Sequence, residues 1–312
     1  MVYFYVTFNF GGIMAKRQYI VGIGEILWDN FDGCSRLGGA SANFAYHVRC
    51  QGGWSAIASA VGNDDEGKKA VAEMAAKGVE TAFVQTVSDA PTGSTVVSFE
   101  DNVPQYEISD PAAWDFLRWD EQLEQLAEQT HAVAFGTLAQ RTPGSREAIR
   151  RFVNSLPAKC PKVLDLNLRP GMHDKNLIVE SMCMANILKL NESEMNYCRK
   201  LLSLTGAPAE GAYTMIERYQ LAAVIITKGL KGVSYYDKEI CFDQPNPDRD
   251  MEIVNTIGCG DAFLAAFLTA RMFGHDPESS AGHAQNVAGY VAACPNAMPE
   301  IPEELQVWRA ER

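Results

Sequence analysis

The sequence Asn255-Thr256-Ile257-Gly258-Cys259-Gly260-Asp261-Ala262-Phe263 joins a glycine-flanked turn to an apolar segment that extends to Phe273. That segment has the composition and length of a buried helix. Gly258 and Gly260 lack the Cβ atoms that would keep a ligand away from the backbone. A helix that begins here leaves its first N–H groups without partners, and with the helix dipole these groups attract an anion. The sequence therefore predicts an anion site at the start of a helix.

Asp261 lies at the mouth of this predicted anion site. A carboxylate there repels the anion unless it acts on it, for example by taking a proton from a hydroxyl group that attacks a phosphate. The alternative is that Asp261 only caps the helix. Cys259, in the same turn, is either a nucleophile or, as we expect, a small filler where alanine would also fit.

The composition describes an ordinary globular protein. The chain has 312 residues, of which 47% are hydrophobic and 21% charged. This length predicts one large α/β domain with room for a small appended piece. The net charge of -12 and the lack of a long basic run argue against nucleic acid or an anionic membrane as the main partner. A phosphorylated small molecule remains open, because a local site can hold it.

Two features of the sequence bear on the cellular location of the protein: the cysteines and the N-terminal residues. The eight cysteines are scattered and form no CxxC pair, which is typical of reduced thiols in a cytoplasmic protein. Residues 1–13 are apolar and aromatic but lack a basic region and a cleavage site, so we expect neither a signal peptide nor a membrane span. We expect the domain to cover residues 14–312 and residues 1–13 to be a disordered or non-native extension.

Most of the chain alternates between strand and helix patterns. Such units predict a mostly parallel sheet covered by helices on both faces, which binds ligands at the carboxyl ends of its strands. The predicted strands are residues 19–27, 54–62, 132–135, 162–167, 185–190 and 222–227, and the predicted helices that follow residue 112 are 120–129, 142–155, 191–203 and 208–219.

Residues 81–108 differ from this alternation. They lack a helical period and contain two β-rich pieces, 92–99 and 104–108. The simplest interpretation is an inserted sheet outside the main alternation, which can close over a small-molecule site as a lid.

Polar residues gather at the predicted carboxyl ends of four strands, in segments 136–137, 165–170, 189–194 and 227–229. In the third segment, Asn191, Glu192 and Glu194 offer oxygen ligands suited to Mg²⁺, through water rather than by direct caging. They are alternatively an acidic helix start that favours the dipole. Residues 227–232 form either a glycine turn beside a nucleotide or a plain hairpin.

A second glycine pair, Gly38-Gly39, precedes another predicted helix. It allows a ligand to approach closely, and Asn43 can hydrogen-bond a polyol. The alternative is a simple helix start that Ser41 caps.

Several enzyme classes lack support. The histidines show no HExxH or other metal spacing, and no GxSxG serine hydrolase motif is present. No GxxxxGK[ST] appears, so a nucleotide site here is not a Walker P-loop.

These motifs together resemble the ribokinase-like (PfkB) carbohydrate kinases. Residues 255–263 resemble the C-terminal signature of that family, and Gly38-Gly-Ala-Ser-Ala-Asn43 resembles its N-terminal signature. The intermediate motifs follow in order over about residues 19–302: Val61-Gly-x-Asp64-x-x-Gly67, Asp165-x-Asn167-x-Arg169, Asn191-Glu192-x-Glu194 and Thr227-Lys-Gly229. Gly24-Glu25-Ile-Leu-Trp-Asp29 and Ala112-Ala-Trp-Asp115 look most like bacterial fructokinases.

The resemblance implies a ribokinase-like α/β/α domain with a mostly parallel sheet and a small β lid, at about residues 30–37 and 90–110, that often mediates dimerisation. Asp261 would be the base that activates the sugar hydroxyl. On the acceptor side, Asp29, Gly39 and Asn43 would hold sugar hydroxyls. Gly258, Cys259 and Gly260 would supply the N–H groups of the anion hole, and Arg169 would sit near the transferring phosphate.

The resemblance also implies ATP and Mg²⁺ as cofactors. Lys189, Asn191 and Glu194 would organise the phosphates, with Asn191 and Glu194 also organising Mg²⁺, Glu194 through water. Thr227, Gly229 and Gly232 would flank the nucleotide, and Asn286 is a further candidate near the adenine.

Two residues depart from the family pattern. Asn255 replaces an aspartate that in many members helps to shape a monovalent-cation loop, so we do not expect potassium activation. Cys259 replaces an alanine, which leaves the backbone donors intact but predicts sensitivity to thiol reagents.

We therefore expect an ATP- and Mg²⁺-dependent kinase that phosphorylates D-fructose at its 6-hydroxyl. The alternatives are a kinase for 2-keto-3-deoxygluconate or another sugar, with a nucleoside kinase less favoured, and a non-catalytic sugar or nucleotide sensor on the same fold. We expect small-molecule partners only, and a homodimer formed through the lid.

Overall fold

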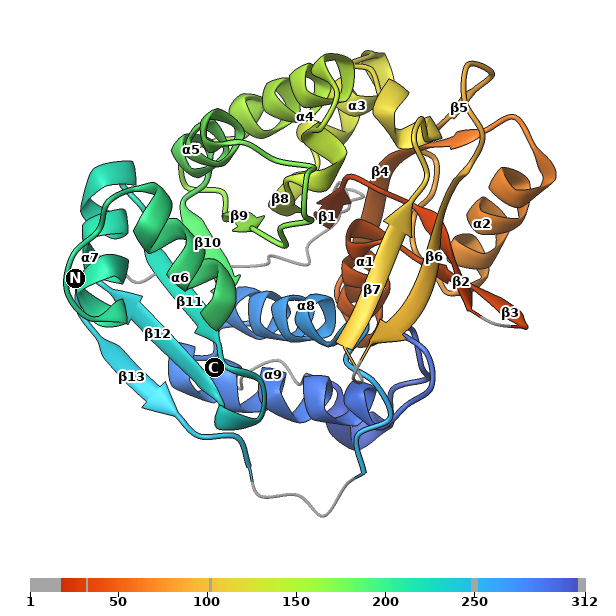
Figure 1. Cartoon of the computed structure of the whole chain (residues 1–312). Helices are drawn as coiled ribbons and strands as arrows, with labels where there is room; N and C mark the ends of the chain where they lie inside the picture. Colours follow the sequence, from red (N-terminus) through yellow and green to blue (C-terminus); the bar gives the residue numbers. More distant parts are fainter. Residues whose placement is uncertain (1–17, 32, 101–102, 248–251, 308–312) are drawn as a thin grey trace, which may run out of the picture.

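The computed structural model describes residues 18–31, 33–100, 103–247 and 252–307 (Figure 1). The predicted N-terminal extension, residues 1–13, lies outside this part of the chain. No helix within it combines the length and apolarity needed to span a membrane.

The described chain contains a large sheet of nine strands in the order β13-β12-β11-β10-β9-β8-β1-β4-β5. All neighbours pair in parallel except β11–β12 and β12–β13, so the sheet is mostly parallel, as predicted. Its strands are β1 (Tyr19–Ile23), β4 (Ser55–Gly62), β5 (Val84–Val87), β8 (Thr130–Phe135), β9 (Lys162–Asp165), β10 (Ile187–Asn191), β11 (Ala223–Thr227), β12 (Val233–Asp237) and β13 (Cys241–Gln244).

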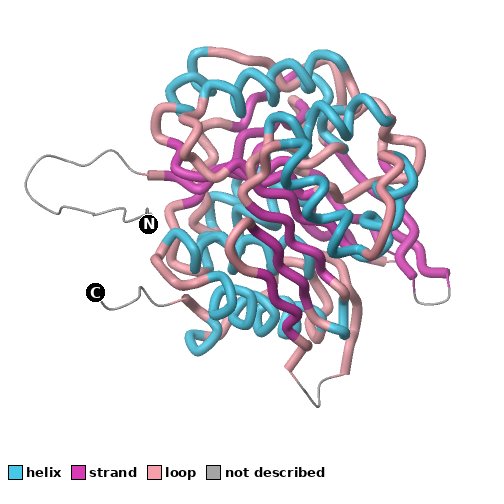
Figure 2. Tube along the Cα trace, turned by 90° about the vertical axis from the view of Figure 1, so that its left-hand side faces the viewer, coloured by secondary structure: helices cyan, strands magenta, loops and turns pink. Residues whose placement is uncertain are grey.

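Helices cover both faces of this sheet (Figures 1 and 2). Alternate residues of each strand point to opposite faces, so in β1 Ile20 packs with α1 and α8, whereas Val21 belongs to the core formed with α3 to α7. The helices are α1 (Ala40–Cys50), α2 (Asp65–Ala76), α3 (Glu121–Ala127), α4 (Pro143–Ser155), α5 (Lys175–Met184), α6 (Glu192–Leu201), α7 (Pro208–Tyr219), α8 (Cys259–Met272) and α9 (Pro277–Ala292), with single 3₁₀ turns η1 (Ala113–Phe116), η2 (Leu138–Gln140), η3 (Gly229–Lys231) and η4 (Glu303–Leu305).

A separate four-stranded sheet has the order β3-β2-β6-β7. It consists of β2 (Leu27–Phe31), β3 (Cys34–Gly38), β6 (Gly93–Glu100) and β7 (Val103–Ile108). Figure 2 shows its β6–β7 hairpin projecting from one side of the molecule. The first strand begins at Leu27, three residues before the predicted start of the lid.

The prediction of one strand over residues 19–27 was wrong. The chain leaves the main sheet after Ile23 and enters the small sheet at Leu27. Gly24 has φ of 152°, which favours glycine, and allows the chain to turn between the two sheets. Glu25 is therefore placed at a junction rather than inside a strand, a position that matters for the site below.

The order of the strands creates a crevice at one edge of the main sheet. From β1 the chain proceeds to β4 and β5 on one side, and later returns to β8, β9 and β10 on the other side. Such a reversal next to β1 is the place where doubly wound sheets bind ligands, at the carboxyl ends of the strands.

The small sheet is attached to the main domain by a buried cluster. The guanidinium group of Arg141 donates to both carboxylate oxygens of Asp115, at 2.8 and 2.6 Å, and to the carbonyl of Ser109 just after β7. Trp114, beside Asp115, is fully buried, and its ring fills the space next to Gly93 at the start of β6. A Cβ atom on residue 93 would overlap the Trp114 ring.

We predict that Gly93→Ala destabilises the fold by about 1–3 kcal/mol, because an inserted methyl group must displace a fully buried ring. Gly144→Ala is the matched control, since the nearest atom to its Cβ is at 3.9 Å. The control should change stability by less than about 1 kcal/mol. Urea unfolding of both variants measures the difference, and equal midpoints would contradict the prediction.

Candidate active site

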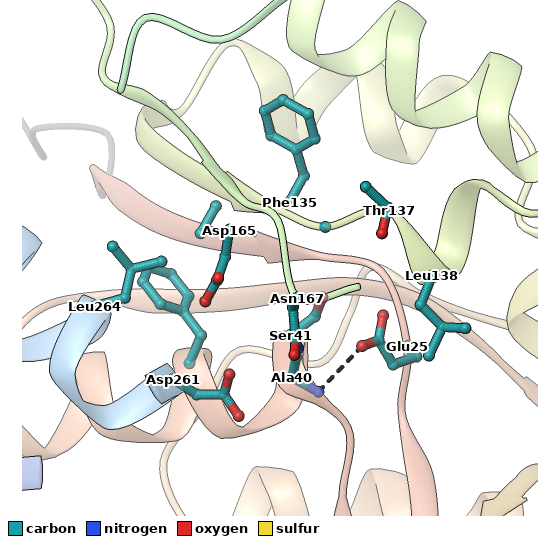
Figure 3. A pocket seen from close by; sticks show the side chains of 13 residues that line it. Glu25, Ala40, Ser41, Phe135, Thr137, Leu138, Asp165, Asn167, Asp261 and Leu264 are labelled. Carbon is teal, nitrogen blue, oxygen red and sulfur yellow. Dashed lines mark hydrogen bonds between the residues drawn. The ribbon is translucent and has the colours of Figure 1, made fainter. Parts of the chain in front are cut away.

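A cavity lies at the crevice between the carboxyl ends of β1 and β8 (Figure 3). Glu25 follows β1, Thr137 follows β8, and Asp165 ends β9. The starts of α1 and α8 close the cavity from the other side with Ser41 and Asp261. Segments that are far apart in the sequence therefore contribute to one cavity.

Asp261 is the third residue of α8 and points into this cavity (Figure 3). Only 9% of its surface is exposed, and its Oδ2 accepts a hydrogen bond of 2.8 Å from Asn43 Nδ2. Gly258 is the N-cap of the helix, and no side chain caps it. The alternative that Asp261 serves only as a helix cap is therefore wrong.

The environment of Asp261 favours a carboxyl group that exchanges protons near neutral pH. Burial raises its pKa to about 7, and the negative charges of Asp165 and Glu25 add to this rise. The hydrogen bond from Asn43 and the charge of Lys189 oppose it. A buried carboxylate with such a pKa suits a general base.

The turn before α8 presents free backbone donors. No described residue accepts a hydrogen bond from the N–H groups of Gly258, Gly260 or Asp261, whereas Cys259 N–H donates to the Thr256 carbonyl at 3.3 Å. Gly258 has φ of 77°. The turn therefore offers the free donors that the predicted anion site requires, although the Cys259 N–H is not among them.

Lys189 lies directly beneath this turn. Its Nζ donates to both oxygens of Asp165, at 2.8 and 3.0 Å, and would lie 2.8 Å from a Cβ on Gly260. Burial by itself favours the neutral amine, but the charges of Asp165, Glu194 and Asp261 outweigh it and raise the pKa of Lys189. A charged ammonium group therefore lies between Asp165 in the cavity wall and Gly260 at the start of α8.

The predicted sugar ligands lie around the small sheet and α1. Asp29 on β2 is buried, and burial raises its pKa to about 7. Gly39 is the N-cap of α1, with φ of 99°. The Ala40 N–H donates to Glu25 Oε1 at 3.2 Å, so Glu25 rather than Ser41 caps this helix (Figure 3). The alternative of a helix start that Ser41 caps was wrong, because Gly39 is the N-cap and Ser41 already lies in the first turn.

Arg169 lies in the loop after β9, where its Nη1 donates to Asn167 Oδ1 at 2.7 Å. Its positive charge opposes the rise in pKa of both Glu25 and Asp29. Arg169 therefore acts electrostatically on these two carboxyl groups, and its predicted place near the transferring phosphate stays a prediction.

Asn191 and Glu194 form a reciprocal cap at the start of α6. Asn191 Oδ1 accepts from Glu194 N–H at 2.9 Å, and Glu194 Oε2 accepts from Asn191 N–H at 2.8 Å. Glu194 Oε1 accepts from Leu168 N–H. The alternative of a helix start is thus correct as local structure. No three His, Cys, Asp or Glu side chains in the described part of the chain gather closely enough to cage a metal ion directly.

Three of the four residues predicted to flank a nucleotide, Thr227, Gly229 and Gly232, lie farther along the same sheet edge. Thr227 pairs with Asn191 across β11 and β10. Gly229 and Gly232, with φ of 57° and 109°, shape the hairpin that joins β11 to β12. Asn286 lies on α9, which packs against β12 and β13. Both the hairpin and the nucleotide interpretations of residues 227–232 therefore remain compatible.

The structure shows the surroundings of Asn255 and Cys259, the two residues that depart from the family pattern. Asn255 Oδ1 accepts from Ile257 N–H, and its Nδ2 donates to the Cys294 carbonyl at 3.1 Å. Burial raises the pKa of the Cys259 thiol to about 12. Because the thiolate is the reactive form, the structure argues against the predicted sensitivity to thiol reagents.

Glu25 and Asp165 line the cavity although the residue-by-residue assignment gave them no role. Glu25 was part of the Gly-Glu pair after the first strand, and Asp165 was part of the Asp-x-Asn-x-Arg motif. The signal was their position at the carboxyl ends of neighbouring strands, which meet at one edge of the sheet.

Comparison with known proteins agrees with this geometry. A fructokinase from Salmonella typhimurium is 27% identical over 243 residues, which are 75% of this chain and 76% of that protein. The fructokinase of Xylella fastidiosa with bound ATP superposes with a TM-score of 0.81 at 21% identity, covering 91% of this chain and 95% of the other. An E. coli protein described as ribokinase II, in complex with ATP and Mg²⁺, superposes with a TM-score of 0.79 at 22% identity over 90% and 94% of the two chains. The ribokinase-like fold is thus confirmed. The model for the "pfkB family carbohydrate kinase" matches residues 24–304, and this chain belongs to that family.

Proposed function

We propose that this carbohydrate kinase transfers the γ-phosphate of ATP to the 6-hydroxyl of D-fructose. The observation that carries the proposal is the buried Asp261 carboxyl, which lies in the acceptor cavity beside the unpaired N–H groups at the start of α8. A base and an anion site next to each other are what phosphoryl transfer to a hydroxyl group requires.

Asp261 takes the proton of the 6-hydroxyl as its oxygen attacks the γ-phosphorus. The bond from phosphorus to the bridging oxygen of ATP breaks, and ADP leaves with that electron pair. The N–H groups of Gly258 and Gly260, together with the Lys189 ammonium, stabilise the negative charge on the transferring group. The proton on Asp261 passes to solvent after the sugar phosphate departs.

For the nucleotide, we propose Thr227, Gly229 and Gly232, at the end of β11 and in the turn after it, together with Asn286 on α9. Structures of the Xylella and E. coli relatives hold ATP, and the latter also holds Mg²⁺. Mg²⁺ bound to the phosphates would neutralise part of their charge. Each Glu194 oxygen already accepts one backbone N–H, which fits contact with Mg²⁺ through water, with Asn191 holding Glu194 in place.

The charges in the cavity favour a neutral sugar over the sugar acid 2-keto-3-deoxygluconate. Three carboxyl groups line it, those of Glu25, Asp165 and Asp261, and Asp29 is buried on strand β2. Lys189 is held by Asp165, and the charge of Arg169 acts on Glu25 and Asp29. An added carboxylate would meet an excess of negative charge, whereas sugar hydroxyls can donate to these oxygens.

A non-catalytic sensor has less support, because a binding protein has no use for a base with a pKa of about 7 beside an anion site. The small sheet, whose β6–β7 hairpin stands out from the body, suits a lid that excludes water from the reaction. Pairing of two copies through this sheet stays a prediction.

We predict that Asp261→Asn lowers kcat by at least roughly 10², with little change in the binding of fructose or ATP, because the amide cannot accept the proton. The measurement is steady-state kinetics with binding constants determined separately. Full activity in this variant would rule out Asp261 as the base.

We predict that activity rises with pH through about 7 and then levels off, since Asp261 must be deprotonated to act and its pKa is about 7. Asp29 titrates in the same range, so Asp29→Asn is the control. That variant should bind fructose more weakly but keep the acidic limb in kcat. Disappearance of the limb in Asp29→Asn would assign it to Asp29 instead.

We predict that, in a coupled ADP-release assay with ATP and Mg²⁺, fructose gives the strongest response in a panel with ribose, glucose, tagatose, adenosine and 2-keto-3-deoxygluconate. Replacing sodium by potassium should not raise the rate, because the Asn255 amide already donates to the Cys294 carbonyl. A stronger response to another sugar would keep the mechanism and replace the substrate. Silence across the panel with ATP still bound would favour the sensor.

A further inference from the structure

Helix α1 contacts both parts of the proposed catalytic apparatus. Asn43 in its first turn donates to Asp261, as described above. One turn later, His47 is fully buried and makes a 2.8 Å hydrogen bond from its Nε2 to the carbonyl oxygen of Ala297. His47 plays no part in the proposed chemistry, so its burial requires another explanation.

The protonation state of His47 follows from its surroundings. Since Nε2 faces a carbonyl oxygen, Nε2 carries the hydrogen and donates it. No described residue reaches the buried Nδ1. Burial lowers the pKa of His47 to about 4. The ring is therefore neutral at physiological pH and holds the Ala297 carbonyl without changing charge.

Ala297 in turn packs against the glycine turn that begins α8. A Cβ on Gly258 would lie 2.6 Å from Ala297 Cβ and 3.2 Å from Ala297 O. Gly258 therefore packs with its bare Cα against the same peptide that His47 holds. A shift of Ala297 must either press on Gly258 or leave a gap beside it, and both would move the N–H groups of the turn.

We propose that His47 is a positioning residue for phosphoryl transfer, which fixes the anion site at the start of α8 through the Ala297 carbonyl. The proposal rests on the proposed kinase function. Asn43 holds the Asp261 carboxylate, and His47 holds the turn that carries the N–H donors. One helix thereby sets the distance between base and anion site, and a misplacement of reacting groups by about 1 Å can lower a rate by about 10².

A neighbouring residue offers a matched control. Tyr46 donates from its hydroxyl to the Pro299 carbonyl at 2.7 Å, so it holds the same C-terminal segment two residues beyond Ala297. Tyr46→Phe removes one buried hydrogen bond to this segment but none to Ala297. If His47 only stabilised the fold, the two changes would affect kcat to a similar extent. A positioning role predicts that the change at His47 lowers kcat much more than Tyr46→Phe does.

The first measurement is kinetic and compares His47→Leu, His47→Gln and Tyr46→Phe below their melting temperatures. Leucine fills the space without a donor, and glutamine restores an N–H donor of similar reach. We expect His47→Leu to lower kcat by about tenfold or more while the KM values for sugar and ATP change less than about threefold. His47→Gln should recover most of the rate, and Tyr46→Phe should stay within about twofold of the parent.

The second measurement is hydrogen exchange of the backbone amides of residues 256–262 in the ligand-free protein, which needs no substrate. His47→Leu should speed exchange there, and Tyr46→Phe should not. If His47→Leu fails to fold, Ala297→Gly replaces it, because this change removes the methyl group against Gly258 and should speed exchange in the same residues.

The outcomes separate the two proposals. A parent protein without sugar-dependent ADP release would overturn the kinase function, while the exchange comparison would still test His47. Unchanged exchange in His47→Leu or in its replacement, equal losses in Tyr46→Phe, or no recovery by glutamine would overturn the positioning role.

Discussion

The ion pair of Lys189 with Asp165 is the interaction on which the arrangement of the site depends. Three other carboxyl groups, those of Glu25, Glu194 and Asp261, lie in the same buried region, and each charge affects the pKa of a neighbour. Taking an unpaired charge out of water costs several kcal/mol. Lys189 supplies the opposite charge. Burial and the charge of Asp165 nevertheless raise the pKa of Asp261 to about 7, so the Asp261 carboxyl group can gain and lose a proton near neutral pH. The same ammonium group explains Gly260, since a side chain there would meet Lys189 Nζ.

The strand order brings these groups together. Because β1 lies inside the sheet between β4 and β8, the chain diverges on either side of its carboxyl end and leaves a crevice there. Glu25 enters this crevice only because Gly24 turns the chain from the main sheet into the small one. The cavity thus lies at the junction of the two sheets, and the proposed lid could cover it without altering the strands that hold Asp165 and Lys189.

Features of the site that depend on short stretches of backbone could be predicted from the sequence. The glycine turn, the start of α8 and the place of Asp261 follow from the chemistry of Gly258 and Gly260, and the strand–helix alternation follows from hydrophobic patterning. Other features depend on partners distant in the chain. The alternative of a Ser41 cap was wrong, and the carboxylate that accepts the Ala40 N–H belongs to Glu25, fifteen residues before Ala40. Helix α5 was not predicted, and the contact of His47 with Ala297, 250 residues away, leaves no local pattern. We expected Cys259 to be a small filler, but its place in the family pattern also predicted sensitivity to thiol reagents. Burial, which the motif does not contain, raises the pKa of its thiol to about 12 and argues against that sensitivity.

The distribution of charge also suggests why the proposed kinase would not hydrolyse ATP in the absence of a sugar. The cavity is lined by the carboxyl groups of Glu25, Asp165 and Asp261, whereas the N–H groups at the start of α8 and the Lys189 ammonium group lie beside it. Under the proposed function, the polyphosphate of ATP is attracted to these donors but repelled by the carboxylates, so the γ-phosphate and Asp261 would come close only when a group between them relieves the repulsion. A sugar hydroxyl does so, because it donates its proton to Asp261 and turns its oxygen toward phosphorus. Water could do the same chemically, but it lacks the further hydroxyls that Asp29, Asn43 and Glu25 can hold, and it is not kept in line for attack. Under the proposed function, the carboxylates that repel the phosphates also bind the sugar hydroxyls, and they would thereby favour transfer to the sugar over transfer to water.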